Sequence, residues 1–398
     1  MRPPSLALLA AVTAIAFCAL HIVVPVLPIL AVSFGESAAH TQLVLTLYLA
    51  GIAAGQLVYG PVSDRFGRRP VLIAGLTMFF VGTVLCGLAW SLAALVVGRV
   101  LEALGACAGV VLGRAIIRDV YERDAAARGI ALVMMAMTLA PAVSPAIGAY
   151  LGEWMGWRAI FVLLGGAGAI VLAVTVARLG ETNRAPVPLD LIGMARSCFV
   201  LLRSPQFLCF ALCSACTSAS WFTFCASAPY LLAHVMGEPP STYGLMILMP
   251  MATYMLGNAL AASFAPVLGS LRMVLLGVAV SLVSGGLMAG WSIVAVSPWA
   301  LFLPMTLSSI GNGLSQPSTM AAGLSIHPNM AGTASGLIGF LQMTTAAFGS
   351  FVVGVLPHET AVPMVAVVGA FMALAMLFAW PVVRPPRRRT VAAVGSAN

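Results

Sequence analysis

The sequence predicts an all-α integral membrane protein with twelve transmembrane helices in two pseudo-symmetric six-helix halves. Of its 398 residues, 61% are hydrophobic and 8% are charged, and the mean hydropathy is +1.05. Soluble domains carry about a quarter charged residues, so a water-soluble fold is excluded. The stretch 273–358 holds no Asp, Glu, Lys or Arg. Since about 20 residues span a bilayer, this stretch alone must contain several spans.

The individual spans are found by dividing the chain at Pro, Gly and charge clusters. This division gives twelve apolar segments, at about 6–32, 41–63, 71–90, 93–117, 129–152, 158–178, 206–234, 242–264, 273–294, 298–324, 332–356 and 361–383. The first segment is longer than the apolar part of a cleavable signal peptide, so we expect it to remain as a span.

Arginine marks alternate loops, which is the third observation behind the twelve-span prediction. One set of loops and termini holds Arg2, Arg65, Arg68, Arg69, Arg118, Arg123, Arg128, Arg178, Arg184, Arg196, Arg203, Arg272 and the group from Arg384 to Arg389. The opposite loops hold Glu36, Glu153, Glu238 and Glu359, with Arg158 as their only basic residue. Because short cytoplasmic loops are enriched in Lys and Arg, both termini are predicted to be cytoplasmic.

The halves are predicted to meet at the break between the sixth and seventh spans. We divide the chain into an N-terminal bundle 1–180, a cytoplasmic linker 181–204, a C-terminal bundle 205–384 and a basic cytoplasmic tail 385–398. In the linker, Arg196 and Arg203 alternate with apolar residues in a pattern typical of a short amphipathic helix on the membrane surface, formed by Leu189, Ile192, Phe199, Val200 and Leu202. Tyr48-x-x-Gly51 in the second span recurs as Tyr254-x-x-Gly257 in the eighth, which favours a two-repeat transporter with its site between the halves.

The loop between the second and third spans carries the most specific motif. Gly60, Asp64, Gly67, Arg68 and Arg69 stand in the order Gly-x-x-x-Asp-Arg-x-Gly-Arg-Arg, which resembles the loop signature of the major facilitator superfamily. The resemblance implies that Asp64 and Arg68, with Asp119 below the fourth span, form a cytoplasmic latch that breaks when the inner side opens. The alternative is a solvated basic loop that only sets topology.

The fourth span contains Arg99 and Glu102, at a position that resembles the superfamily's Arg-x-x-Gln motif. An arginine inside the membrane is costly unless it faces a partner or a cavity. Glu102 lies one turn from Arg99, so two interpretations stay open: a static ion pair, or a protonatable Glu102 that contributes to proton coupling.

The fifth span carries Pro141, Ser144, Pro145 and Gly148, a set similar to the superfamily's antiporter motif. Small residues permit close helix packing, and proline frees a backbone carbonyl. We expect this span to pack against a helix of the other half. Its association with exporters is implied by the resemblance alone.

The first span places His21 four residues before Pro25 in a His-x-x-x-Pro-x-x-Pro pattern. This segment resembles that of drug exporters in which an Asp precedes Pro-x-x-Pro, and His21 stands where the Asp would be. Histidine titrates near physiological pH, so it could carry a proton or contact the substrate. A packing role is the alternative.

Shorter stretches over most of the chain resemble the bicyclomycin and chloramphenicol resistance group. That resemblance implies a proton-coupled exporter of small apolar or weakly polar drugs in the bacterial inner membrane, and export of an endogenous metabolite such as a sugar, amino acid or siderophore is the alternative. The residues expected to bind substrate are His21, Tyr48, Gln56, Trp221, Phe224, Tyr254, Asn258, Gln316 and Gln342. The expected partners are drug, protons and membrane lipid, with the protein as a monomer.

Other classes of function find little support in the residues. There is no nucleotide-binding loop of the Gly-x-x-x-x-Gly-Lys type and no nucleophile with a base, so we expect neither an ATPase nor an enzyme. The arginines lie in short loops without interleaved aromatic residues, which argues against nucleic-acid binding. Cys209, Cys213 and Cys216 lie on one helical stripe, but no His or carboxylate joins them, so we expect no metal site and no cofactor.

Overall fold

The computed structural model describes residues 4–121, 123–183, 188, 190–294 and 297–383, and in this part every regular element is helical. Arg2, Arg184, Leu189, the group from Arg384 to Arg389 and the tail 385–398 lie outside the described residues. The first half contains α1 (Leu6–Ile22), η1 (Val24–Val26), α2 (Leu27–Phe34), α3 (Ala38–Phe66), α4 (Arg68–Gly87), α5 (Leu92–Val120), α6 (Arg123–Trp154) and α7 (Arg158–Arg178). The second contains α9 (Pro205–Tyr230), η2 (Leu231–Val235), α10 (Pro240–Met246), α11 (Leu248–Leu268), α12 (Ser270–Val294), α13 (Pro298–Ile326), η3 (Pro328–Met330), α14 (Ala331–Val355) and α15 (Val362–Val383).

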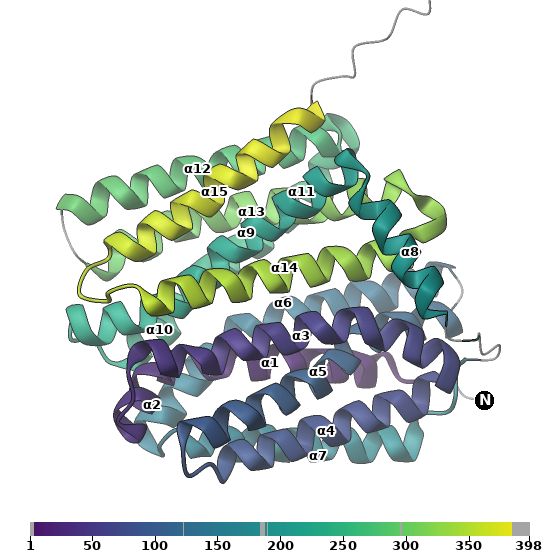
Figure 1. Ribbon diagram of the computed structural model, residues 1–398, viewed down its shortest axis with the longest axis horizontal. Helices are drawn as coiled ribbons and strands as arrows, with labels where there is room; N and C mark the ends of the chain where they lie inside the picture. Colours follow the sequence, from purple (N-terminus) through teal and green to yellow (C-terminus); the bar gives the residue numbers. More distant parts are fainter. Residues whose placement is uncertain (1–3, 122, 184–187, 189, 295–296, 384–398) are drawn as a thin grey trace, which may run out of the picture.

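The helices form two stacked groups with roughly common axes, α1–α7 below and α9 with α11–α15 above in Figure 1, while α10 lies beside the first group. Among the described residues, ten helical stretches are long and apolar enough to cross a membrane, and α6 and α13 run alongside them. α1 with α2 forms one span, and α10 with α11 forms another. The predicted all-α membrane fold is confirmed, and the ten candidate spans together with α6 and α13 are consistent with the predicted twelve. Between the halves, the predicted amphipathic segment forms α8 (Leu191–Leu202), which lies across one end of the bundle.

We call that end, which carries the loop between α3 and α4, the arginine-rich end, and the other the arginine-poor end. The hydrogen bonds that join the two halves within the described part of the chain lie at the arginine-poor end. There, Ser350 contacts both Gln42 (3.3 Å) and Thr46 (2.9 Å), Tyr230 donates to the Leu27 carbonyl, and the Ser241 N–H donates to Glu153. The two halves are therefore held together on this side.

Proline interrupts the first span next to His21. α1 ends at Ile22, Val24–Val26 form a single 3₁₀ turn, and α2 begins at Leu27. Because Pro25 has no N–H, it cannot continue the α-helical hydrogen-bond ladder. The break in the first span thus lies beside His21.

Glycine allows the fifth span to make close contacts on two sides. A side chain at Gly148 would overlap the Ile22 carbonyl of α1, so its role is packing within the first half. The expected contact with the other half is made one turn earlier, where Gly244 of α10 faces Pro145 and Ala146. Ser144 is buried between these contacts. The motif therefore fixes α6 against both halves at once.

Candidate functional site

A cavity of about 170 Å³ lies between the two halves. The first half contributes α1 and α6, and the second contributes α9, α11 and α13. The lining residues are Phe17, His21, Met137, Thr138, Pro141, Thr217, Ser218, Trp221, Phe222, Met251, Tyr254, Ser309, Asn312 and Gln316. Mostly apolar walls with a few hydrogen-bonding groups are typical of small-molecule sites.

His21 is nearly fully buried and lines this central cavity. Its Nδ1 lies 3.0 Å from the Phe17 carbonyl oxygen. Since a carbonyl only accepts, Nδ1 carries the hydrogen and Nε2 is the open acceptor. Nε2 has no hydrogen-bond partner among the described residues, and the ring lies 5.9 Å from the Phe222 ring of the other half. A proton or a ligand donor can therefore be taken up at Nε2.

Four of the nine side chains expected to bind substrate line the central cavity, namely His21, Trp221, Tyr254 and Gln316. Phe224 lies behind Trp221 and packs edge-on against Phe302. Gln342 also lies behind the wall, where its side-chain amide donates to the Ser214 hydroxyl (2.6 Å) and to the side-chain amide oxygen of Gln316 (3.2 Å). These two residues can act on a ligand only through their neighbours.

The other three expected residues are farther from the central cavity. Tyr48 is fully buried and donates to the Ala16 carbonyl (3.1 Å). Gln56 packs against Gly339 of α14 and lines a different cavity at the arginine-rich end. Asn258 does not line either cavity, and its Oδ1 is buried without a hydrogen-bond partner among the described residues.

Several cavity residues were not predicted, although helical spacing could have found them. Phe17 precedes His21 by four positions, Thr217 precedes Trp221 by four, and Met251 precedes Tyr254 by three. Residues three and four apart share a helix face. These residues could therefore have been found by following the helix face of each predicted residue one turn further. Other lining residues that were not predicted are Phe222 on α9, Ser309 on α13 and Met137 on α6.

Arg99 and Glu102 form an ion pair that is sealed inside the first half. Both are 0% exposed, and Arg99 Nη1 lies 2.6 Å from Glu102 Oε2. Thr83 donates to the other carboxylate oxygen (2.9 Å), and the guanidinium lies 3.9 Å from the centre of the Tyr48 ring. Arg99 Nη1 also donates to the Ala19 carbonyl (3.0 Å), two residues before His21. The pair does not line the central cavity but is bonded to the helix that carries His21.

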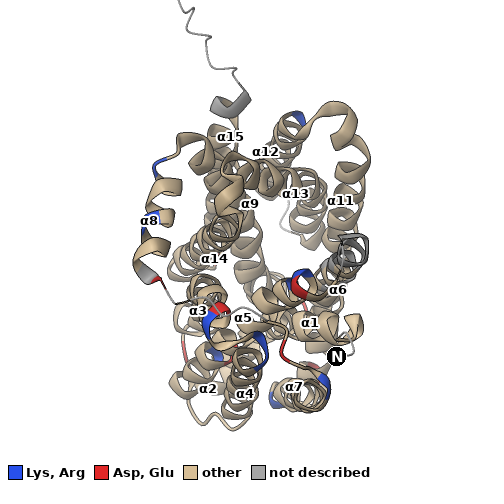
Figure 2. Ribbon diagram, turned by 90° about the vertical axis from the view of Figure 1, so that its right-hand side faces the viewer, with Lys and Arg blue, Asp and Glu red and all other residues tan. Residues whose placement is uncertain are grey.

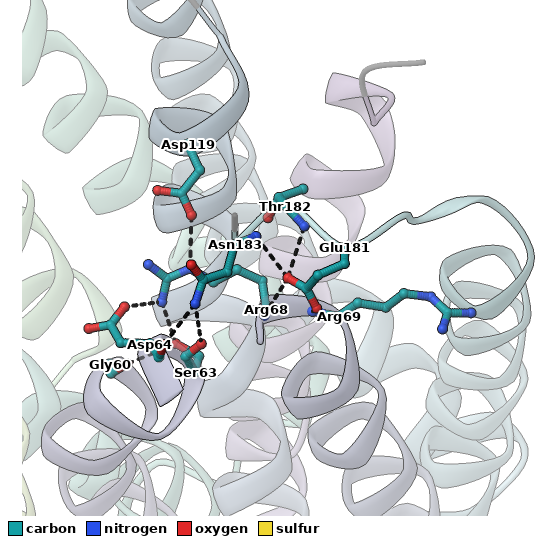
Figure 3. A network of polar contacts seen from close by, with 9 residues as sticks. All are labelled: Gly60, Ser63, Asp64, Arg68, Arg69, Asp119, Glu181, Thr182 and Asn183. Carbon is teal, nitrogen blue, oxygen red and sulfur yellow. Dashed lines mark hydrogen bonds and ion pairs between the residues drawn. The ribbon is translucent and has the colours of Figure 1, made fainter. Parts of the chain in front are cut away.

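The three expected latch residues lie together at the arginine-rich end (Figure 3). Arg68 is 2.6 Å from Asp64 through Nη1 and donates to Asp119 through Nε (2.9 Å). All three belong to the first half, and their ion pairs are intact although the hydrogen bonds between the halves lie at the opposite end. That these three residues form a latch that breaks when the inner side opens stays a prediction.

A segment absent from the predictions, Glu181 to Asn183, ties the linker to this loop. The Glu181 carboxylate accepts from the backbone N–H groups of Arg68 (2.9 Å), Arg69 (3.2 Å), Thr182 (2.9 Å) and Asn183 (2.8 Å). The Asn183 amide donates to the Asp64 carbonyl (2.7 Å). A carboxylate at the start of α4 caps the first N–H groups of the helix and interacts favourably with the positive end of its dipole. Glu181 therefore fixes the turn from which Arg68 extends, as Figure 3 shows.

Replacing Gly67 by alanine is expected to lower the free energy of unfolding by about 1–3 kcal/mol, the cost of a non-glycine residue in a strained backbone region. Gly67 has φ +98°, and an added methyl would collide with the Glu181 carboxylate. Gly60→Ala is the matched control, because Gly60 has open space around it in the same motif. The measurement is the midpoint of thermal unfolding in detergent. An equal midpoint for both variants would contradict the role given to Gly67.

Comparison with known proteins places this arrangement among membrane transporters. The profile of the Major Facilitator Superfamily matches residues 9–350. A chloramphenicol resistance protein of Pseudomonas aeruginosa is 32% identical over 365 residues, covering 86% of this chain and 81% of the relative. A bicyclomycin resistance protein homolog of Haemophilus influenzae is 26% identical over 346 residues, or 86% of each chain. Multidrug resistance protein D of Escherichia coli is 30% identical over 305 residues, or 76% of each.

Solved structures show the same fold at low sequence identity. A D-xylose-proton symporter superposes with a TM-score of 0.74 at 16% identity, covering 95% of this chain and 96% of the other. A bacterial homolog of the human lysosomal transporter Spinster, in an inward-facing and occupied conformation, gives 0.72 at 18% identity with the same coverage. At these identities the likeness concerns the fold alone.

Proposed function

The chain belongs to the major facilitator superfamily, and we propose that it exports small apolar or weakly polar drugs, of amphenicol or bicyclomycin type, in exchange for protons. It is a multi-pass membrane transporter with antibiotic-resistance proteins among its relatives, not an enzyme. The observation that carries the proposal is the central cavity between the halves, lined by His21 and by aromatic and amide side chains.

The lining of the central cavity favours neutral cargo. Phe17, Trp221 and Phe222 offer aromatic surface, while Asn312 and Gln316 offer amide groups. Among the described residues that line it, none is an Asp, Glu or Arg. An ionised cargo would have to be buried without a counter-charge, which is costly. An apolar drug with a few hydroxyl or amide groups suits the site better than a sugar or amino acid exported as a metabolite.

We infer the orientation of the protein in the membrane from the distribution of arginine. On the positive-inside rule, the arginine-rich end and both termini face the cytoplasm of a bacterial cell. The hydrogen bonds at the arginine-poor end then close the outer side, so the conformation is inward-facing. In the proposed cycle, drug reaches the central cavity from the inside, the halves rock, and the cluster around Arg68 packs against the second half to close the cytoplasmic side.

Proton coupling is assigned to His21, with Arg99 and Glu102 behind it. His21 lines the central cavity and its Nε2 is an open acceptor, so protonation there places a positive charge where the drug binds. The charge disfavours apolar cargo and so couples proton uptake to drug release. Arg99 of α5 donates to the Ala19 carbonyl of α1, the helix that carries His21. Through this hydrogen bond the buried pair sets the position of His21.

Replacing His21 by asparagine is expected to abolish proton-coupled transport while leaving the fold intact. The Asn amide can still donate toward the Phe17 carbonyl, but it does not titrate. The measurement is the pH gradient of energised everted vesicles, followed with a quenched dye while chloramphenicol, florfenicol, bicyclomycin and a lipophilic cation are added in turn. Dequenching is expected for the wild type and for His40→Asn, an exposed histidine that pairs with Glu36, and not for His21→Asn.

Two results would count against the proposal. Dequenching by none of these compounds, with folded protein present in the vesicles, would favour a metabolite exporter or an uncoupled carrier. Unchanged dequenching in His21→Asn would remove this residue from proton coupling.

A further inference from the structure

We propose that the cavity at the arginine-rich end binds an anionic phosphate group, either the headgroup of a membrane lipid or a soluble phosphate ester. This cavity has a volume of about 450 Å³ and lies between the two halves, apart from the central cavity. Its polar lining includes Gln56, Asp64, Arg68, Arg114, Arg118 and Asn329. The inference does not depend on drug export, because none of these residues lines the central cavity.

The first half supplies two arginines without counter-ions. Arg114 and Arg118 lie four positions apart on α5, and within the described part of the chain neither makes an ion pair or hydrogen bond. The one carboxylate that lines the cavity, Asp64, lies 2.6 Å from Arg68. Side chains four apart share a helix face, so both guanidinium groups reach the same side of α5. The cavity therefore carries an excess of positive charge.

The second half adds a helix N-terminus to the same cavity. α14 begins at Ala331, its N-cap Met330 makes no side-chain capping bond, and its first turn holds no acidic residue. Gly332 and Thr333 of that turn line the cavity. The N–H groups at the start of α14 and the positive end of the helix dipole favour an anion. Arginine from one half and a helix N-terminus from the other thus face one space, which is the donor set that phosphate prefers.

The shape of the site gives a lipid headgroup a route to these donors. Met194 and Cys198 of α8 line the cavity, while Ile192 and Phe199 of the same helix are exposed. α8 lies outside the bundle beside α14 and α9, as Figure 2 shows from the arginine-rich end. A helix with one apolar face lies in the membrane interface, at the depth of lipid headgroups. A phosphate bound here touches both halves and therefore stabilises the conformation in which this cavity exists.

The test measures lipid binding to purified full-length protein in a neutral detergent. The midpoint of thermal unfolding is followed while phosphatidylglycerol, phosphatidylcholine, glycerol phosphate or inorganic phosphate is added. We expect phosphatidylglycerol to bind the wild type on the order of ten-fold more tightly than phosphatidylcholine. Arg114→Gln and Arg118→Gln should each weaken phosphatidylglycerol binding about ten-fold, since each removes a charge-assisted hydrogen-bond donor.

The matched control is the double variant Arg196→Gln/Arg203→Gln, which removes two arginines from α8 and leaves the cavity unchanged. It should keep the preference for phosphatidylglycerol. Arg114→Lys keeps the charge and should recover part of the binding. Such a recovery would show that the loss in Arg114→Gln is not a folding defect. If glycerol phosphate binds as tightly as the lipid and competes with it, the ligand is a soluble ester at the same site. Equal binding in wild type and Arg114→Gln/Arg118→Gln, or equal loss in the α8 variant, would overturn the proposal.

Discussion

Replacing Arg99 by glutamine is expected to lower the free energy of unfolding by about 3–5 kcal/mol, the cost of leaving a buried charge without its partner. Glu102 is fully buried, and its carboxylate is held by Arg99 and by Thr83. Without the guanidinium, an ionised Glu102 would be isolated in a low-dielectric interior. The measurement is unfolding in detergent micelles, followed by circular dichroism. Glu36→Gln, at the exposed acid that pairs with His40, is the control and should change stability little.

The double variant Arg99→Gln/Glu102→Gln separates the two interpretations of this pair. If the pair is static, each single variant destabilises the protein, and the double variant recovers much of the loss because no charge is left unpaired. If Glu102 titrates during coupling, Glu102→Gln alone should fold and bind chloramphenicol normally but lose proton-driven transport. A stable and fully active Glu102→Gln protein would contradict both roles.

The geometry favours anchoring over direct proton exchange. Arg99 bonds to the Ala19 carbonyl and lies on the Tyr48 ring, so it joins α1, α3 and α5 into one unit. α4 also packs closely against α5 at this point. Gly82 of α4 allows the close approach, since a side chain there would collide with the Glu102 backbone. An arginine bonded to the α1 backbone two residues before His21 can transmit movements of the first half to His21. Its effect on coupling would then act through position and not through its own protonation.

The fold could be predicted from the sequence because a bilayer permits few kinds of spanning structure. A chain with apolar segments of this length must satisfy its backbone within each helix, so counting segments counts spans. The pairing of Asp64 with Arg68 was predictable for a similar local reason, since the two lie four positions apart at the end of one helix. Both predictions rest on short-range geometry that can be recognised in a single stretch of sequence.

The parts that were missed depend on contacts between distant segments. Tyr48 and Tyr254 occupy matching positions in the two repeats, yet only Tyr254 lines the central cavity. The difference comes from α5, where Arg99 covers the Tyr48 ring, whereas α13 carries no arginine. Glu181 was missed because it bonds to backbone N–H groups of Arg68 and Arg69, and such contacts leave no pattern in the residues they serve.

Replacing Arg68 by alanine is expected to reduce drug-driven proton movement at least ten-fold, because Asp64 and Asp119 are left facing each other without a cation. Two carboxylates that have lost their shared cation repel each other, so the loop that must pack against the second half loses its geometry. Arg69→Ala is the matched control. Arg69 is its neighbour in the motif, but its guanidinium donates to the Leu179 and Val176 carbonyls and not to Asp64 or Asp119. Transport is measured by dye dequenching in everted vesicles.

The variants of this loop distinguish a conformational role from a topological one. If Arg68 only marks the cytoplasmic side, Arg68→Ala and Arg69→Ala should behave alike, because each removes one positive charge from the same loop. If Arg68 organises the closed state, only its variant fails, and Arg68→Lys restores transport in part, since lysine supplies the charge but not the separate Nη1 and Nε donors that reach Asp64 and Asp119. The transport activity of Glu181→Gln should lie between those of Arg69→Ala and Arg68→Ala. The glutamine keeps one oxygen with two acceptor lone pairs near the start of α4, but it loses the negative charge that interacts favourably with the helix dipole. The order expected for transport is therefore Arg69→Ala above Glu181→Gln, and Glu181→Gln above Arg68→Ala.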